Sequence, residues 1–205
     1  FVVSTVNIEE NGKRTPIRYV EPPGIDRVRD PASQNFVQQN EQSLSLRVCN
    51  LKSGDARGAF KALNFDIRNY KNFKMFVHAE GDQLNDGDLS AFIRIGTDLV
   101  GNYYEYEIPL KLTPWGATSA EAIWPEANNM EIVFEDLTNL KKSRNDLMEA
   151  ENPTVSMNVA YSEPVPNDPT KRITVKGSPN LQDLRTIMIG VRNPRSNGDH
   201  PWKPD

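Results

Sequence analysis

The sequence is poor in the side chains that most enzymes and metal sites use. It contains one cysteine and two histidines among 205 residues. Cys49 alone excludes an internal disulfide and any metal site built from several cysteines, and we do not expect it to act as a nucleophile. His78 and His200 do not stand at the spacing of metal ligands. Phosphate-loop, dinucleotide-binding and serine-hydrolase motifs are also missing, so we expect no cofactor and no enzymatic activity.

Long apolar runs and an excess of positive charge are missing too. No stretch approaches the roughly 18 to 20 apolar residues that cross a bilayer as a helix, and the N-terminus lacks the pattern of a signal peptide. The formal net charge is -4 and the pI is near 5.3, which gives no electrostatic reason to expect nucleic acid as a partner. We therefore expect a soluble module whose cellular location is determined by sequence outside these 205 residues.

What the sequence does contain is a set of segments with alternating polarity, which is typical of strands with one buried face. In residues 103–110, for example, Tyr104 and Tyr106 alternate with Glu105 and Glu107, which predicts buried tyrosines and solvent-exposed glutamates. The six strand candidates are residues 44–50, 73–79, 89–95, 103–110, 173–175 and 187–191. The predicted buried set is Phe73, Met75, Val77, Leu89, Ile93 and Ile95 with the two tyrosines.

One helix and two irregular regions complete the predicted organisation. Apolar residues at helical spacing predict a helix over at least residues 137–147, with Asp136 as its N-cap, whereas residues 131–134 fit a strand equally well. Prolines mark residues 1–40 as an extended arm and loop, apart from a short extended piece at 17–20, and they mark residues 163–170 as a surface excursion. Residues 41–195 are the predicted domain and 196–205 a tail.

Short alternating strands, long loops and one short helix predict a mainly β fold. We expect an antiparallel β-sandwich of jelly-roll type, because no strand–helix–strand rhythm is visible. An immunoglobulin-like sandwich is the structural alternative, and the lack of a cysteine pair weakens it.

Two acidic groups are the remaining candidates for chemistry. The loop at residues 81–88 is rich in Asp and Asn, but it places Leu84 and Ile93 where an EF-hand needs ligands, so a solvated turn is favoured over a calcium site. A glycosidase needs two carboxylates, and these could come from the group Asp86, Asp88, Glu105 and Glu107. The alternating pattern, however, favours a solvent-exposed face for Glu105 and Glu107.

Several aromatic residues fall outside the predicted core. Phe76, Phe92 and Tyr103 lie on strand faces that read as polar, and Trp115 and Trp124 stand beside prolines in loops. Such residues are either covered by the helix or left exposed as a patch for a partner. We therefore name these five as a possible partner surface, and as a possible sugar platform if they form an exposed row.

A set of short segments, in order along most of the chain, resembles the SprA/Sov family. The segments are residues 19–25 (YVEPPGI), 50–57 (with NL, GD and R), 65–70 (FDIRNY), 124–126 (WPE), 175–181 (VKGSPNL) and 189–194 (IGVRNP). No single segment is specific, but the set is.

The resemblance implies a very large outer-membrane component of the type IX secretion system of Bacteroidetes, associated with gliding motility in some members. It further implies that this chain is one soluble, non-catalytic module of a giant translocon barrel, in the periplasm or outside the cell. Its partners would be the rest of the barrel, accessory subunits or secreted cargo, and the fragment would not span a membrane. A jelly-roll carbohydrate-binding module of a cell-surface protein is the alternative function.

Overall fold

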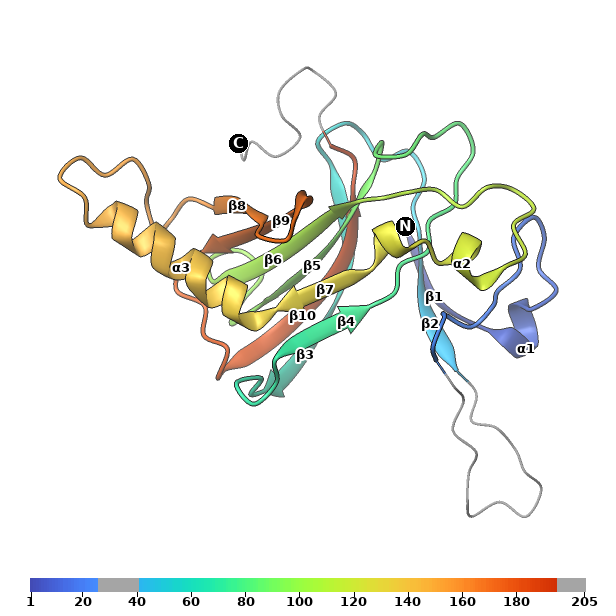
Figure 1. The fold of residues 1–205 in the computed structure, drawn as a ribbon, viewed down its shortest axis with the longest axis horizontal. Coiled ribbons are helices and arrows are strands. Elements are labelled where there is room, and N and C mark those ends of the chain that lie inside the picture. The colour runs from blue at the N-terminus through green and yellow to red at the C-terminus, as the bar shows by residue number, and fades with distance from the viewer. Residues whose placement is uncertain (26–40, 195–205) are drawn as a thin grey trace, which may run out of the picture.

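The computed structural model describes residues 1–25 and 41–194, and these form the elements drawn in Figure 1. The strands are β1 (Val2–Asn7), β2 (Gln42–Arg47), β3 (Ala56–Phe65), β4 (Asn72–Met75), β5 (Ser90–Gly96), β6 (Tyr103–Pro109), β7 (Met130–Val133), β8 (Tyr161–Val165), β9 (Asp168–Lys176) and β10 (Leu184–Arg192). The helices are α1 (Ile8–Asn11), α2 (Ala120–Ile123), the short 3₁₀ turn Glu126–Asn128 and α3 (Phe134–Met148).

A six-stranded antiparallel sheet is the centre of the fold. Its strand order is β3-β10-β5-β6-β9-β8, so the central strands come from distant parts of the chain. Two smaller antiparallel pairs, β4-β7 and β1-β2, stand apart from it. Figure 1 shows α3 and the β4-β7 pair lying across the same face of the large sheet. The described residues therefore form two layers on that side, a sheet and a cover made of one helix and a short ribbon.

The apolar core lies between the sheet and this cover. Ile93 and Tyr104 of adjacent strands are 1% and 2% exposed, and Leu137 and Leu140 of α3 pack in the same cluster. Ile95 and Tyr106 are buried there as well, while Phe73, Met75, Val77 and Leu89 are partly buried against it. The predicted register of β5 and β6 is thus confirmed, because side chains two residues apart on a strand point to one face. Val77 and Leu89 lie outside the strands, since β4 ends at Met75 and β5 begins at Ser90.

The predicted helix is confirmed, but it begins earlier than expected. Strand β7 occupies residues 130–133, and α3 follows directly with Val133 at its N-cap position, so Asp136 lies inside the first turn and does not cap it. Arg144 is fully buried beneath the helix and donates a 2.6 Å hydrogen bond from Nη1 to the carbonyl of Gly177. This bond and a 2.9 Å bond from Lys141 Nζ to the Pro179 carbonyl attach α3 to the loop after β9.

The first residues are more structured than a detached arm. Residues 2–7 form β1, which pairs with β2, and Ile17 and Tyr19 are buried in a second apolar cluster with Ile123 and Trp124. The short extended piece predicted at residues 17–20 supplies two of these four side chains. The division into arm, domain and tail stays a prediction, and residues 196–205, with His200, lie outside the described part of the chain.

The region rich in prolines near residue 165 also differs from the expected surface excursion. Strands β8 and β9 pair as a tight antiparallel hairpin across it. Pro164 is tolerated because β8 is the edge strand of the sheet, where a missing N–H breaks no ladder.

The fold is mainly β with antiparallel sheets, as predicted, whereas the jelly-roll topology is not confirmed. In the part of the chain that the structure describes, no helix has the length and apolar character needed to cross a membrane.

Candidate functional site

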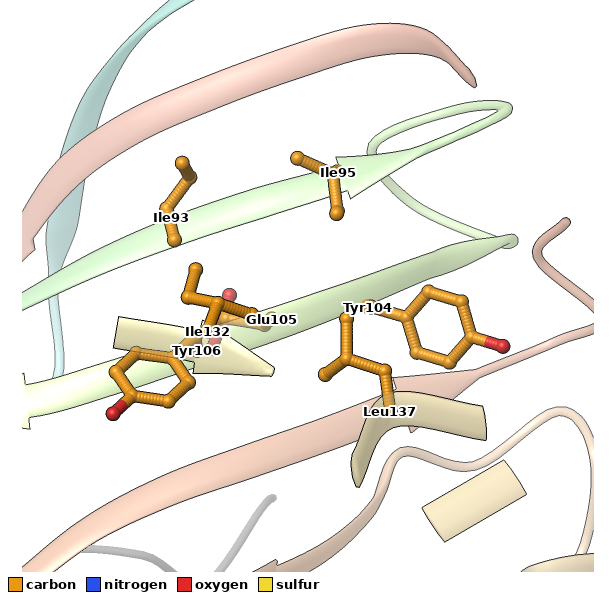
Figure 2. Close-up of a pocket in the computed structure, with 7 residues that line it drawn as sticks. All are labelled: Ile93, Ile95, Tyr104, Glu105, Tyr106, Ile132 and Leu137. Carbon is orange, nitrogen blue, oxygen red and sulfur yellow. The ribbon is translucent and has the colours of Figure 1, made fainter. Parts of the chain in front are cut away.

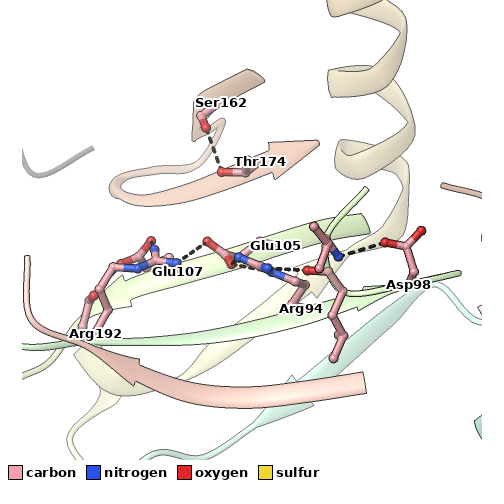
Figure 3. A network of polar contacts seen from close by, with 10 residues as sticks. Arg94, Asp98, Glu105, Glu107, Ser162, Thr174 and Arg192 are labelled. Carbon is pink, nitrogen blue, oxygen red and sulfur yellow. Dashed lines mark hydrogen bonds and ion pairs between the residues drawn. The ribbon is translucent and has the colours of Figure 1, made fainter. Parts of the chain in front are cut away.

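The main polar cluster of the molecule lies on the face of the large sheet that α3 does not cover. Register places Arg94 of β5 beside Glu105 of β6, and Ser90 beside Arg192 of β10. Glu107 stands two residues from Glu105 on the same face of β6. We call these five residues the ionic face (Figure 3).

The charged groups of the ionic face satisfy one another. Arg94 donates to Glu105 Oε2 from Nε at 2.9 Å and from Nη2 at 2.6 Å. Arg192 bridges the two carboxylates, with Nη2 3.0 Å from Glu105 Oε1 and Nη1 bound to Glu107. The Ser90 hydroxyl donates to the other oxygen of Glu107. The carboxylates of both glutamates are therefore bonded to side chains of the same sheet. The expectation that they face solvent is wrong.

The burial of these groups explains their electrostatics. Glu105 and Glu107 are 5% and 4% exposed. Burial raises the pKa of Glu107 from 4.5 to about 7, against the opposing attraction of Arg192. For Arg192 the two carboxylates outweigh the effect of burial, and its pKa is raised. Arg192 thus attracts both carboxylates in one low-dielectric site, whereas burial and the neighbouring charge of Glu105 favour the protonated form of Glu107.

Two of the five predicted surface aromatics cover this network and are not exposed. Arg94 lies 3.9 Å from the ring centroid of Tyr103, and Arg192 lies 4.8 Å from that of Phe92, both at cation–π distance. The two rings are 7% and 2% exposed. Phe92 fits because a β-carbon at Gly190 would lie 2.4 Å from its Cζ, so only glycine leaves room there. Neither ring can offer an accessible surface on the described residues.

The other three predicted surface aromatics differ from one another. Trp124 is buried and donates a 2.9 Å hydrogen bond from Nε1 to the Val20 carbonyl, so it attaches the N-terminal segment. Phe76 is half-buried against the same cluster. Trp115 is 49% exposed at the turn that follows Pro114. A sugar platform needs an exposed row of rings, and these five do not form one.

His78 has a structural environment as well. Its Nδ1 lies 2.9 Å from the Ile123 carbonyl and 3.0 Å from the Thr113 hydroxyl, and Nε2 lies 3.4 Å from Glu80. Burial lowers its pKa. Because β4 ends at Met75, His78 lies outside this strand, although the sequence predicts a strand over residues 73–79.

The acidic loop at residues 81–88 uses its carboxylates to hold its own turns. Asp88 accepts a 2.7 Å hydrogen bond from the Asn85 amide, and Asp86 accepts one of 2.8 Å from the Leu112 amide. Among the described residues, no three histidine, cysteine or acidic side chains come together to hold a metal ion. The geometry fits the favoured interpretation of this loop as a turn.

The core also contains a small recess (Figure 2). It lies between the sheet and its cover and is too narrow to hold a water molecule. The surface that lines it is wholly apolar, and the residues around it are Ile93, Ile95, Tyr104, Glu105, Tyr106, Ile132 and Leu137. Ligand sites usually measure about 300 to 1,000 Å³ and gather several polar groups, so this recess is a packing feature of the core.

Sequence reasoning missed the ionic face as a unit. A usable signal was present, since Arg94 and the two glutamates fall on the polar faces of two successive predicted strands. The strand order was not predictable locally, because β10 pairs with β5 although residues 97–183 separate the two strands in the sequence.

The comparisons with known proteins agree with the resemblance seen in the sequence. No curated protein matches the chain. A family model described as motility related/secretion protein matches residues 1–201, which is nearly the whole length. The chain therefore belongs to the SprA N-terminal family of motility-related and secretion proteins.

Proposed function

We propose that this chain is a non-catalytic structural and interaction module of a giant outer-membrane channel for protein secretion, of the type IX kind that serves gliding motility in Bacteroidetes. The observation that carries the proposal is the family match over residues 1–201. The module would lie in the cell envelope, in the periplasm or outside the cell. It would present its surface to the rest of the translocon barrel, to accessory subunits or to secreted cargo.

The chemistry of the polar groups supports a role without catalysis. A general acid or base must be free to reach a substrate proton. Glu107, whose raised pKa would suit that task, is enclosed with Ser90 and Arg192 and is 4% exposed. Because these polar groups are bonded to one another inside the fold, they are not available to a substrate. The module would then act through its outer surface, by binding other proteins.

The proposal predicts that an exposed aromatic contributes to function without contributing to folding. Trp115→Ser in the full-length protein should leave the module folded, because the side chain is 49% exposed, but should reduce cargo secretion or capture of an accessory subunit. Trp115→Phe is the matched control and should retain both. Full secretion by the serine variant would remove Trp115 from the proposed surface, and loss of binding to a glycan array would favour the carbohydrate-binding alternative.

A further inference from the structure

The two edges of the large sheet are built differently. Strand β8 ends one edge with five residues, a proline and an irregularity between Pro164 and Val165. Short length, proline and irregular pairing are the devices that prevent an edge from pairing with another strand. Strand β3 ends the other edge with ten residues and contains no proline. Among the described residues, no strand pairs with its outer side.

The outer side of β3 offers hydrogen-bonding groups in a regular row. Residues 56–62 pair with β10 without a shift in register. In an antiparallel pair, alternate residues direct their N–H and C=O groups away from the partner strand. The first seven residues of β3 therefore present a straight edge to which an extended segment can add by main-chain hydrogen bonds.

The side chains of β3 indicate what kind of segment would fit. Arg57 and Lys61 are exposed on one face of the strand, and no acidic residue of β3 lies on that face. This edge is therefore locally positive, although the whole chain has a net charge of -4. Arg57 Nη2 lies 3.8 Å from Asp55 Oδ2, and its Nη1 donates a 2.7 Å hydrogen bond to the Ala56 carbonyl. An incoming strand with acidic side chains four residues apart would place one opposite each cation, since the alternating side chains of paired strands meet on the same face.

The other face of β3 adds an apolar component. Phe60 is 69% exposed, an unusual position for a phenylalanine in the middle of a strand. Beyond the regular part of the strand, Phe65 at its last position and Tyr70 in the following turn are 49% and 56% exposed, with ring centroids 5.7 Å apart. Exposed aromatic side chains are the residues on which interface energy is often concentrated.

We propose that β3 is a docking edge for an extended acidic segment of a partner polypeptide, which adds to the sheet as a seventh strand. Acidic side chains of that segment would lie opposite Arg57 and Lys61, and an apolar side chain would lie against Phe60. This inference deepens the proposed interaction role and names the class of partner. Its test uses a purified chain and short peptides, so it can fail independently of any secretion assay.

The test is an NMR titration of the chain with a capped peptide, Thr-Glu-Val-Thr-Val-Glu-Thr, whose glutamates match the spacing of Arg57 and Lys61. We expect saturable shifts of the β3 amides, and about tenfold weaker binding of the same peptide with lysine in place of glutamate. The double variant Arg57→Glu/Lys61→Glu should reverse this preference, which an unfolded protein could not do. Lys142→Glu, an exposed charge change on α3, should leave it unaltered.

Main-chain pairing is tested with N-methylated peptides. Methyl groups on the amides of one edge should abolish binding, and methyl groups on the other edge should have little effect, because only one edge of an added strand faces β3. Three results would overturn the proposal. They are equal binding of the acidic and basic peptides, no binding of either peptide, and binding that both methylated forms retain. So would sedimentation showing a dimer that the Arg57→Glu/Lys61→Glu variant dissociates, since the occupant would then be a second copy.

Discussion

The two faces of the large sheet are both buried, but different interactions hold them. On the face beneath α3, Ile93 and Tyr104 pack against Leu137 in an apolar core. On the opposite face, Glu105 and Arg192 are fixed by ion pairs and covered by aromatic rings. The first arrangement stabilises through apolar area removed from water, whereas in the second the pairing offsets the desolvation cost of the buried charges only while every partner is present. The second is therefore sensitive to the loss of any single member.

The strongest test of the apolar face is Ile93→Asp. This change would place an unpaired carboxylate at a position that is 1% exposed, and we expect a loss of about 4 kcal/mol or more in the free energy of unfolding. Ile93→Val is the matched control, with an expected cost of about 1 kcal/mol. Chemical denaturation measures both. Unchanged stability of the aspartate variant would show that the register of β5 is wrong.

On the ionic face the equivalent change is Glu105→Ala. It would leave Arg94 and Arg192 close together without the carboxylate that both contact, and we expect a loss of about 3 to 5 kcal/mol. Glu131→Ala removes the exposed ion pair with Lys74 and should be almost neutral by the same denaturation assay. Equal effects of the two substitutions would mean that the ionic face is as solvated as the outer surface.

The pH dependence of stability distinguishes the faces again. Because the pKa of Glu107 is raised from 4.5 to about 7 in the folded state, the folded protein holds this proton more tightly than the unfolded chain does. Its contribution to the free energy of unfolding should therefore fall as pH rises from about 4.5 to 7, by at most about 3 kcal/mol. Denaturation of Glu107→Gln across this range should lack that component. An identical pH profile for the variant and the wild type would contradict the shift.

The smallest expected effect concerns the aromatic cover of the ionic face. Phe92→Leu keeps an apolar side chain against Gly190 but removes the ring that lies over Arg192, and we expect a cost of about 1 to 2 kcal/mol. Thermal unfolding measures it, with Trp115→Leu as a control at an exposed aromatic. If Phe92→Leu is as stable as the control, the contact between the ring and Arg192 contributes nothing measurable to stability.

The sequence predicted the apolar face far better than the ionic face, for a physical reason. Alternation assigns Tyr104 and Glu105 to opposite faces of β6, and that assignment is right. It cannot say whether something covers the polar face, because that depends on the strands that become neighbours. The register of β10 with β5 brings Arg192 within reach of the glutamates, and no local pattern contains this pairing.

The missed strands have local explanations. Strand β3 mixes glycine and alanine with Arg57, Phe60 and Lys61, and it lacks the alternation of a strand with one buried face because it lies at an edge. Three prolines in residues 163–170 predict a surface excursion, although this stretch includes the end of β8 and the start of β9. In both cases the position of the strand in the sheet outweighed its intrinsic preference.

The most direct test of the central claim, that the module acts without catalysis, is cargo secretion by cells whose full-length protein carries Glu107→Gln. Glutamine keeps the shape of the side chain and its ability to bond Ser90, but it can no longer exchange a proton near neutral pH. We predict secretion at the wild-type level. Loss of secretion while the module remains folded would mean that this carboxyl group is needed for chemistry, and the account would be wrong.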